Sequence, residues 1–391
     1  MLIDDFVNFV REAYNRPNGF IPLHEPVFNG NEKKYLNECV DSTFVSSVGK
    51  FVTEFENQVK EYTGSKHAIA ASSGTAALHI ALVLSEVKPG DEVITQPLTF
   101  VATANAISYT GASPIFIDVD RDTMGLSPEK LELFILNNTK PELNIQTNKV
   151  QPKNLSSGKF ITAVIPMHTF GHPARIEEIK IICDKNNIIL IEDAAESLGS
   201  YYKGKHTGTF GLFGTLSFNG NKTITTGGGG MLITDDDELA KKAKHITTTA
   251  KVPHPWEYVH DTIGYNYRLT NLAAALGVAQ MEQLDSFVSS QRLLASEYQK
   301  FFENSGIQFV TENENTKANY WLNTVILKDR EERNNFLKET NDRDIMTRPI
   351  WELMNRLDMF KEFQTGDLSN SEWLADRVVN ITSSVRVNNS K

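Results

Sequence analysis

The chain has 391 residues, of which 40% are hydrophobic and 23% charged, and its formal net charge is −10. This length predicts two domains, or one large domain with an appendage, and the composition is that of a globular protein. The acidic balance argues against nucleic acid as the main partner, because binding a phosphate backbone requires a basic surface. It is still compatible with a local basic pocket for one diphosphate.

The cysteines and the N-terminus narrow the class of protein further. Cys39 and Cys183 lie far apart and neither has metal-site spacing, so we expect two buried thiols and no metal. The first residues, MLIDDFVNFVREAYN, carry two acids and lack the apolar core of a signal peptide. We find no apolar run near the roughly 20 residues of a membrane span. These features predict a cytoplasmic protein.

Short apolar segments alternate with helix-like segments through the first part of the chain. This alternation predicts an α/β fold, with a mainly parallel sheet covered by helices on both faces. Ligands of such sheets bind beyond the carboxyl ends of the strands. Strands are predicted at 67–71, 92–96, 114–119, 161–167, 188–191 and 231–234, and helices at 75–84, 100–109, from Ser127 onward, and at 176–185.

Two breaks interrupt this pattern. The polar, proline-containing stretch 138–158 predicts a loop or insertion, and Pro253-His254-Pro255 ends the alternation. A long helix at 271–300 and a strand at 323–327 are predicted beyond it.

We place a domain boundary near residue 250. The chain then divides into a large domain at 26–250 and a smaller C-terminal α+β domain at 251–391. Residues 1–25 are expected to pack on the smaller domain or at a dimer interface.

A lysine followed by a glycine run is the most informative segment. It reads Ser217-Phe218-Asn219-Gly220-Asn221-Lys222-Thr223, with glycines at 227–230. Glycine-rich backbone is required where a ligand or another strand approaches closely, although a surface lysine beside a flexible hairpin also fits. The spacing departs from the phosphate loop of nucleoside triphosphatases, which needs adjacent glycine and lysine. We also find no dinucleotide-type glycine pattern after a strand.

Two further segments lie at predicted strand ends. The strand ILIED delivers Asp193 beside small residues, where a carboxylate could hold a pyridine nitrogen protonated; a helix cap or a salt bridge is the alternative. The segment Ala71-Ser72-Ser73-Gly74-Thr75 turns from a strand into a helix, which makes an anion site, although simple capping needs no phosphate. Together the three segments supply an amine, a ring-nitrogen partner and a phosphate cradle.

In this order the segments resemble the DegT/DnrJ/StrS sugar aminotransferases, which are fold-type I pyridoxal phosphate (PLP) enzymes. The resemblance covers nearly the whole chain and rests on SSGTAAL at 72–78, TFVAT at 99–103, PMHTFGHPA at 166–174, IEDAAESLGS at 191–200, GTFGLFGTLSFNGNKTITTGGGGM at 208–231 and GYNYRLTNLAAALGVAQME at 264–282.

The resemblance implies a role for each matching residue. Lys222 is implied as the lysine that forms the Schiff base, and Asp193 as the partner of the pyridine nitrogen. Gly74, Thr75 and Ser217 are implied as phosphate ligands, Phe100 as the ring stacked on the cofactor, Glu196 as a neighbour of the ring hydroxyl, Asn219 as a weaker cofactor contact, and Asn266 as the residue that reaches the neighbouring subunit's phosphate in a homodimer.

The predicted reaction moves an amino group from glutamate to a keto-sugar nucleotide. Glu196, where many relatives carry His or Gln, and the segments 20–36 and 346–356 resemble the branch that makes UDP-4-amino-4,6-dideoxy-N-acetylglucosamine. The acceptor implied is therefore the C4 ketone of a UDP-2-acetamido-2,6-dideoxy-hexos-4-ulose. Weaker candidates for contact with it are Arg268, Tyr320, Arg348 and Trp351.

Three alternatives stay open at this point. The acceptor could be a dTDP-3-keto or a GDP-4-keto sugar. A sugar dehydratase of the same family would carry His in place of Lys222, and a non-catalytic PLP or sugar-nucleotide sensor would have no need of the Lys222 and Asp193 pair.

Overall fold

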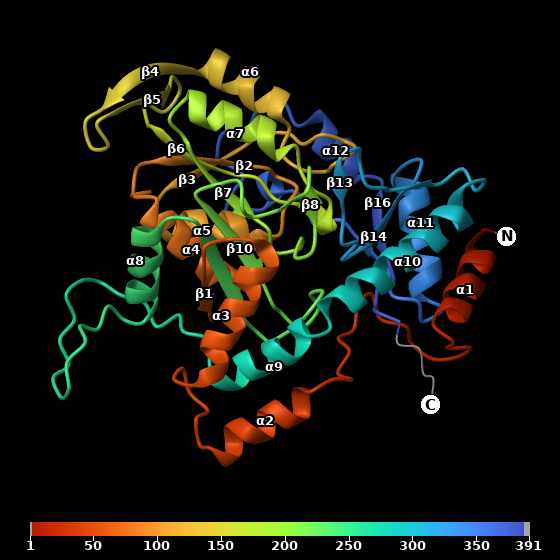
Figure 1. Cartoon of the computed structure of the whole chain (residues 1–391). Helices are drawn as coiled ribbons and strands as arrows, with labels where there is room; N and C mark the ends of the chain where they lie inside the picture. The colour runs from red at the N-terminus through yellow and green to blue at the C-terminus, as the bar shows by residue number, and fades with distance from the viewer. Residues whose placement is uncertain (1, 387–391) are drawn as a thin grey trace.

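The computed structural model describes residues 2–386, and a seven-stranded sheet lies at its centre (Figure 1). One strand runs antiparallel to both of its neighbours and the remaining neighbouring pairs are parallel, which confirms the predicted α/β class. In spatial order the strands are β1 (His67–Ala71), the antiparallel β11 (Gly230–Thr234), β10 (Phe213–Ser217), β7 (Ile189–Asp193), β6 (Ile161–Ile165), β2 (Glu92–Thr95) and β3 (Ser113–Phe116).

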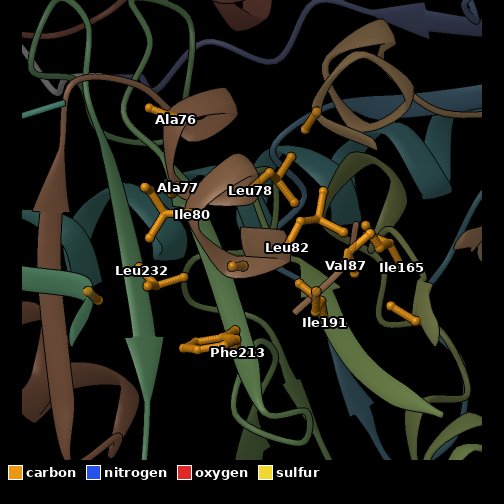
Figure 2. Packing of buried hydrophobic residues seen from close by; sticks show 14 of the residues in the cluster. Ala76, Ala77, Leu78, Ile80, Leu82, Val87, Ile165, Ile191, Phe213 and Leu232 are labelled. Carbon is orange, nitrogen blue, oxygen red and sulfur yellow. The ribbon is translucent and has the colours of Figure 1, made fainter. Parts of the chain in front are cut away.

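Helices cover both faces of this sheet because successive strand residues point to opposite sides. One face packs against α4 (Gly74–Leu84), α5 (Val101–Tyr109) and α8 (Asp237–Thr247). Figure 2 shows α4 lying over Phe213, Leu232 and Ile191. The other face packs against α3 (Lys50–Thr63), α6 (Pro128–Asn138), α7 (Ile176–Lys185) and α9 (Asn271–Met281).

Two predicted elements differ in detail in the structure. The stretch 138–158, predicted as a loop or insertion, forms an antiparallel hairpin of β4 (Thr139–Asn144) and β5 (Lys149–Asn154), in which two prolines face each other. The helix predicted at 271–300 breaks at Glu282-Gln283 into α9 and α10 (Leu284–Phe302). The break falls where Glu282 accepts hydrogen bonds from Asn31 and Tyr35 at the start of α2 (Glu32–Asp41), so tertiary contacts override the helical pattern there.

A second unit lies beside the main sheet and carries both ends of the described chain. Its four-stranded sheet has the order β12 (Gln308–Phe309), β14 (Asn323–Ile326), β16 (Val378–Ile381) and β15 (Arg348–Pro349). The helix α1 (Leu2–Ala13) packs here, with Phe6 against Tyr298, Phe302 and Phe336. The rest of the unit includes α10, α11 (Arg330–Asn341) and α12 (Ser369–Ala375). A separate small sheet has the strand order β13 (Thr316–Lys317), β8 (Tyr201–Tyr202) and β9 (Lys205–His206).

The packing of α9 bears on how the chain divides. Phe55 of α3 and Phe218 lie in one buried cluster with Ala275 and Val278 of α9, so α9 belongs to the helical cover of the main sheet. The predicted domain boundary near residue 250 stays a prediction.

Residues 251–263 form a long arm that extends away from the main sheet (Figure 1). Trp256, Tyr258 and Ile263 in this arm are each more than three-quarters exposed. Cys39 and Cys183 are buried free thiols, as predicted. Among the residues that the structure describes, none of the helices combines the length and apolar character needed to cross a membrane.

Candidate active site

The carboxyl edge of the main sheet gathers the residues singled out in the sequence. β1 ends at Ala71 and leads into α4, β7 ends at Asp193, and β10 ends at Ser217 and leads into the Lys222 loop. The antiparallel β11 begins at this same edge, at the end of the glycine run. The three chemically suggestive segments therefore meet where a parallel sheet places its ligands.

Lys222 lies in a closed loop between β10 and β11. The loop is pinned at its base by hydrogen bonds from the Phe218 N–H to the Gly229 carbonyl (2.9 Å) and from the Thr226 N–H to the Phe218 carbonyl (3.0 Å). The Lys222 side chain is 14% exposed, and its Nζ lies 3.2 Å from Glu196 Oε1. This amine is therefore held against a carboxyl group rather than projecting into solvent, as a surface lysine would.

Glu196 is buried and anchored on its second oxygen. Its Oε2 accepts a hydrogen bond from the Phe170 N–H at 2.9 Å. Burial raises the pKa of Glu196 to about 7, although the Lys222 ammonium opposes that shift. A carboxyl group that titrates near neutrality beside an amine can exchange a proton with it.

Asp193 is buried and has few donors around it. Its Oδ2 accepts from the Thr103 hydroxyl at 2.7 Å, and its Oδ1 accepts from the Ala195 N–H at 3.2 Å. Burial raises the pKa of Asp193, and the Thr103 hydroxyl opposes the shift. Because a nearby cationic N–H favours the charged form of a carboxyl group, this site suits a protonated ring nitrogen.

The turn from β1 into α4 is built around close backbone approach. Ser73 caps α4 by accepting from the Ala76 N–H at 3.0 Å. A Cβ on residue 230 would lie 2.5 Å from the Gly74 nitrogen, so glycine is required where β11 passes the turn. A Cβ on residue 74 would lie 3.3 Å from Ser217 Oγ, which places the predicted phosphate ligands together. Thr75 follows in the first turn of α4, where free N–H groups favour an anion.

Aromatic side chains stand beside this edge. Phe100, which precedes α5, is 51% exposed, and its ring centroid lies 6.4 Å from that of Trp351. The Trp351 ring also packs on Phe170, with centroids 4.9 Å apart. The structure thus connects Phe100 and Trp351 to the Glu196 anchor, and an exposed Phe face is available to a planar ring.

Other predicted residues lie at varying distance from Lys222. Arg268 bridges to Ala71 beside the α4 turn, and its buried Nε has no hydrogen-bond partner among the described residues. Asn219 is exposed and donates to Asn221 Oδ1 at 3.2 Å, and Asn266 is exposed at the base of the arm. Tyr320 is buried in the second unit, where its hydroxyl accepts from the Glu312 N–H.

Arg348 lies on β15, where its guanidinium donates to Asn341 Oδ1 and to the Thr347 carbonyl. The structure does not connect Arg348 or the Tyr320 ring with Lys222 through these contacts. A substrate role for either residue stays a prediction.

Three residues of the site were missed in the sequence. Thr103 lies within the motif TFVAT, four residues after Thr99, and a threonine at helical spacing gives little sign that it faces a distant carboxylate. Trp321 lies under Lys222, with Nζ 3.8 Å from its ring centroid, and Asn319 donates to the Glu196 carbonyl at 2.9 Å. Trp321 reaches Lys222, and Asn319 reaches Glu196, from a part of the chain about 100 residues or more away, so local spacing could not reveal them.

Comparison with known proteins decides the family. The model of the DegT/DnrJ/EryC1/StrS aminotransferase family matches residues 27–391. The chain belongs to this family. It is 39% identical to a protein named GDP-perosamine synthase from Escherichia coli O157:H7, over 88% of each chain. It is 40% identical to a putative pyridoxal phosphate-dependent aminotransferase, EpsN, from Bacillus subtilis, over 87% of this chain and 84% of EpsN.

A solved structure agrees with this assignment. The aminotransferase TlmJ from Streptoalloteichus hindustanus superposes with a TM-score of 0.84 at 25% identity, covering 95% of each chain. The predicted fold type, enzyme class and cofactor are therefore confirmed. The chain is a PLP-dependent aminotransferase of the sugar-nucleotide class.

The residues of this chain fit the cofactor. The α4 turn with Ser217 offers N–H and hydroxyl donors for a phosphate, and the buried Asp193 has room for a further donor at its carboxylate. Lys222 would supply the amine, and Phe100 offers an exposed ring. These four features come from different strand ends that share one edge, so a single planar, phosphorylated ligand could contact all of them.

Proposed function

We propose that the chain transfers the amino group of glutamate to the C4 ketone of a UDP-2-acetamido-2,6-dideoxy-hexos-4-ulose. The observation that carries the proposal is the placement of the two segments that resemble this branch. Ile21 bridges to Ile345, and the Met346 N–H donates to the Ile21 carbonyl at 2.9 Å, so the segments pair with each other. The second segment continues to Trp351, beside Phe100. The second segment thus ends beside the predicted cofactor ring contact, and the first segment pairs with its start.

The groups of this chain divide the work of the reaction. When bound, pyridoxal phosphate would supply both an electron sink and an aldehyde that can accept the amino group. Lys222 Nζ takes the proton from the donor carbon and later returns a proton to the acceptor carbon. Glu196 Oε1, 3.2 Å from Nζ, balances the charge of the ammonium that forms. Asp193 keeps the ring nitrogen protonated, and Phe100 orients the ring.

A GDP-linked 4-keto sugar is the second candidate acceptor. The observation that favours it is the E. coli relative, whose name denotes formation of a GDP-linked amino sugar. UDP and GDP sugars differ in the base and share the diphosphate, so contacts to the diphosphate alone do not separate the two candidates. Arg268, beside the α4 turn with an unpartnered Nε, is our candidate for a diphosphate contact.

Competition between acceptors tests the proposal. The enzyme is incubated with glutamate and equal concentrations of UDP-4-keto-N-acetyl, GDP-4-keto and dTDP-3-keto sugars, and the aminated products are separated by mass. We expect the UDP product to form fastest, and Lys222→Ala protein provides the blank. Faster formation of either rival product overturns the UDP assignment while leaving the aminotransferase class intact.

We also propose a homodimer whose two sites are shared across the interface. The support is the arm and its base. The arm exposes Trp256, Tyr258 and Ile263, whereas large apolar patches on a monomer are uncommon. At its base the Tyr267 carbonyl accepts from the Ser72 N–H at 2.8 Å, so the arm starts beside the α4 turn, close to the exposed Asn266.

Subunit mixing tests the shared site. Lys222→Ala and Asn266→Ala proteins are each expected to lose activity as homodimers. After exchange, one of the two sites in a mixed dimer regains both residues, so part of the activity should return. Proven subunit exchange without any recovery would contradict a site built from two chains.

A further inference from the structure

Trp321 contacts the Lys222 loop in two ways. Lys222 Nζ lies 3.8 Å from the centroid of the Trp321 ring, which is the geometry of a cation–π contact. The indole N–H donates to the carbonyl of Asn221, the residue before the lysine, at 2.6 Å. Trp321 is 3% exposed, so both contacts are shielded from water. One side chain therefore holds the backbone before the lysine and also its amine.

Asn319 contacts the backbone around Glu196. Its Nδ2 donates to the carbonyls of Glu196 and Leu198, both at 2.9 Å, and approaches Thr223 Oγ1 at 3.4 Å. Its Oδ1 accepts from the backbone N–H of Trp321 at 2.8 Å, so the two residues are held together. Asn319 thus joins the backbone that carries the carboxyl group to the loop that carries the amine.

The backbone around these contacts adopts a conformation that side chains disfavour. Tyr320, between Asn319 and Trp321, has a φ of 52°, and Phe170, whose N–H holds Glu196, has a φ of 56°. A Cβ on residue 171 would clash with Asn319 Oδ1 at 1.8 Å, so glycine is required there. Left-handed backbone at non-glycine residues concentrates at functional sites, because surrounding contacts must maintain it.

We propose that Trp321 and Asn319 are positioning residues that set the place of the Lys222 amine relative to Glu196. They act from residues 319–321, which precede β14 of the second unit, so packing of that unit determines the geometry of the lysine. The proposal rests on the role of Lys222 in the proposed function. It is independent of the identity of the acceptor sugar.

The first test is the half-reaction with glutamate alone, followed as loss of the visible cofactor band in the holoenzyme. Trp321→Leu removes the ring and the N–H donor, and we expect the rate constant to fall about 30-fold at saturating glutamate, from the combined loss of a shielded cation–π contact and a hydrogen bond. Trp321→Phe retains a ring face, and we expect a loss of about fivefold. The apparent glutamate affinity should change less than the rate constant, and the cofactor band should shift in Trp321→Leu.

Trp373 provides the matched control. It lies on α12, with the guanidinium carbons of Arg121 and Arg377 at 4.5 and 4.7 Å from its ring centroid, so it also makes cation–π contacts. Trp373→Leu should lower the unfolding temperature and leave the rate constant and the band of the folded protein unchanged. If Trp321→Leu behaves in that way, Trp321 is structural and the proposal is overturned.

The second test uses the protein stripped of cofactor. Hydrogen exchange of a peptide covering 219–223 should be faster in Trp321→Phe and in the near-isosteric Asn319→Asp than in the wild type, while a peptide from α6 exchanges unchanged. Unchanged exchange at 219–223 in both variants contradicts the proposal that Trp321 and Asn319 hold the Lys222 loop in place. These variants keep the test decisive if Trp321→Leu fails to fold. Borohydride reduction and peptide mapping of wild-type holoenzyme separately establishes whether Lys222 is the attached lysine.

Discussion

The strand β7 ends in two neighbouring carboxylates, Glu192 and Asp193, whose surroundings differ. Consecutive strand residues point to opposite faces, and both Glu192 and Asp193 are buried. Asp193 has two donors, Thr103 and Ala195. Glu192 has four, which are His168 Nε2 and the N–H groups of Gly208, Phe210 and Gly211 at 2.6–3.0 Å.

This difference in donors suggests different roles for Glu192 and Asp193. The two oxygens of an ionised carboxylate offer about four acceptor positions, and Glu192 has a protein donor for each of them. The Ala174 N–H donates to His168 Nδ1, so the ring proton of His168 lies on Nε2 and faces Glu192. Glu192 thus fixes the turn that leads into β10 and Lys222. Asp193 has two protein donors and keeps spare acceptor positions, which fits its proposed role as the partner of a ligand nitrogen.

Removing the Lys222 amine should lower turnover more than any other change in the site. If Lys222 has its proposed role, Lys222→Ala removes both the attachment of the cofactor and proton transfer, and general acid–base catalysis alone contributes roughly 10²–10⁴-fold. We expect turnover to fall by at least about 10³-fold, with loss of the borohydride-reducible adduct. An adduct that survives on another lysine would show that the wrong residue was assigned.

Exchanging each carboxylate for its amide sharpens the comparison. Asp193→Asn should lower turnover by at least about 100-fold, because the electron sink weakens, while the unfolding temperature changes little. Glu192→Gln should show the reverse pattern. In Glu192→Gln the new amide NH₂ group faces N–H donors, so the variant should lose about 3 kcal/mol of unfolding free energy, measured by denaturant titration. The turnover of the folded variant should change by about threefold or less. Less than a threefold loss in Asp193→Asn would remove its assigned role.

The pH dependence of stability should report on Glu196. Because its pKa is raised to about 7 in the folded protein, the folded state binds a proton more tightly than the unfolded state does. The stability this contributes is present at pH values below the ordinary carboxyl range and is lost as pH rises through about 7. We expect the cofactor-free protein to lose up to about 3 kcal/mol between pH 5 and 8. Glu196→Gln should flatten that profile, and an identical slope in wild type and variant would contradict the shift.

A smaller effect is expected one contact away from Asp193. Thr103→Val keeps the shape of the side chain and removes the donor to Asp193 Oδ2. A hydrogen bond to a charged group contributes roughly 1.5 kcal/mol or more, so turnover should fall about tenfold. Thr110→Val is the control, because the Thr110 hydroxyl donates to a backbone carbonyl at the end of α5. Equal losses in the two variants would mean that the effect is general destabilisation.

The sequence predicted the parts of this site that lie in one stretch of chain. Strand-to-turn patterns located Asp193, the Gly74 turn and the Lys222 loop, because the carboxyl ends of parallel strands share one edge. The sequence could not predict that β7 carries two carboxylates of different kind, since the donors to Glu192 come from residues 168 and 208–211. It likewise did not reveal Trp321 and Asn319, or the strands of the β4–β5 hairpin within the predicted loop or insertion, because both depend on contacts made after folding.

The smallest effect is expected at Asn219, where the family pattern and the structure can be weighed directly. Asn219 lies three residues before Lys222, yet its side chain is exposed and donates to Asn221 Oδ1, also at the surface of the loop. The loop is closed by backbone hydrogen bonds at Phe218 instead, which Asn219→Ala leaves in place. We therefore expect turnover within about twofold of wild type, in the range of an exposed hydrogen bond. A loss of tenfold or more in the glutamate half-reaction would show that Asn219 contacts the cofactor. The ligand site beside Asp193 would then include the start of the Lys222 loop.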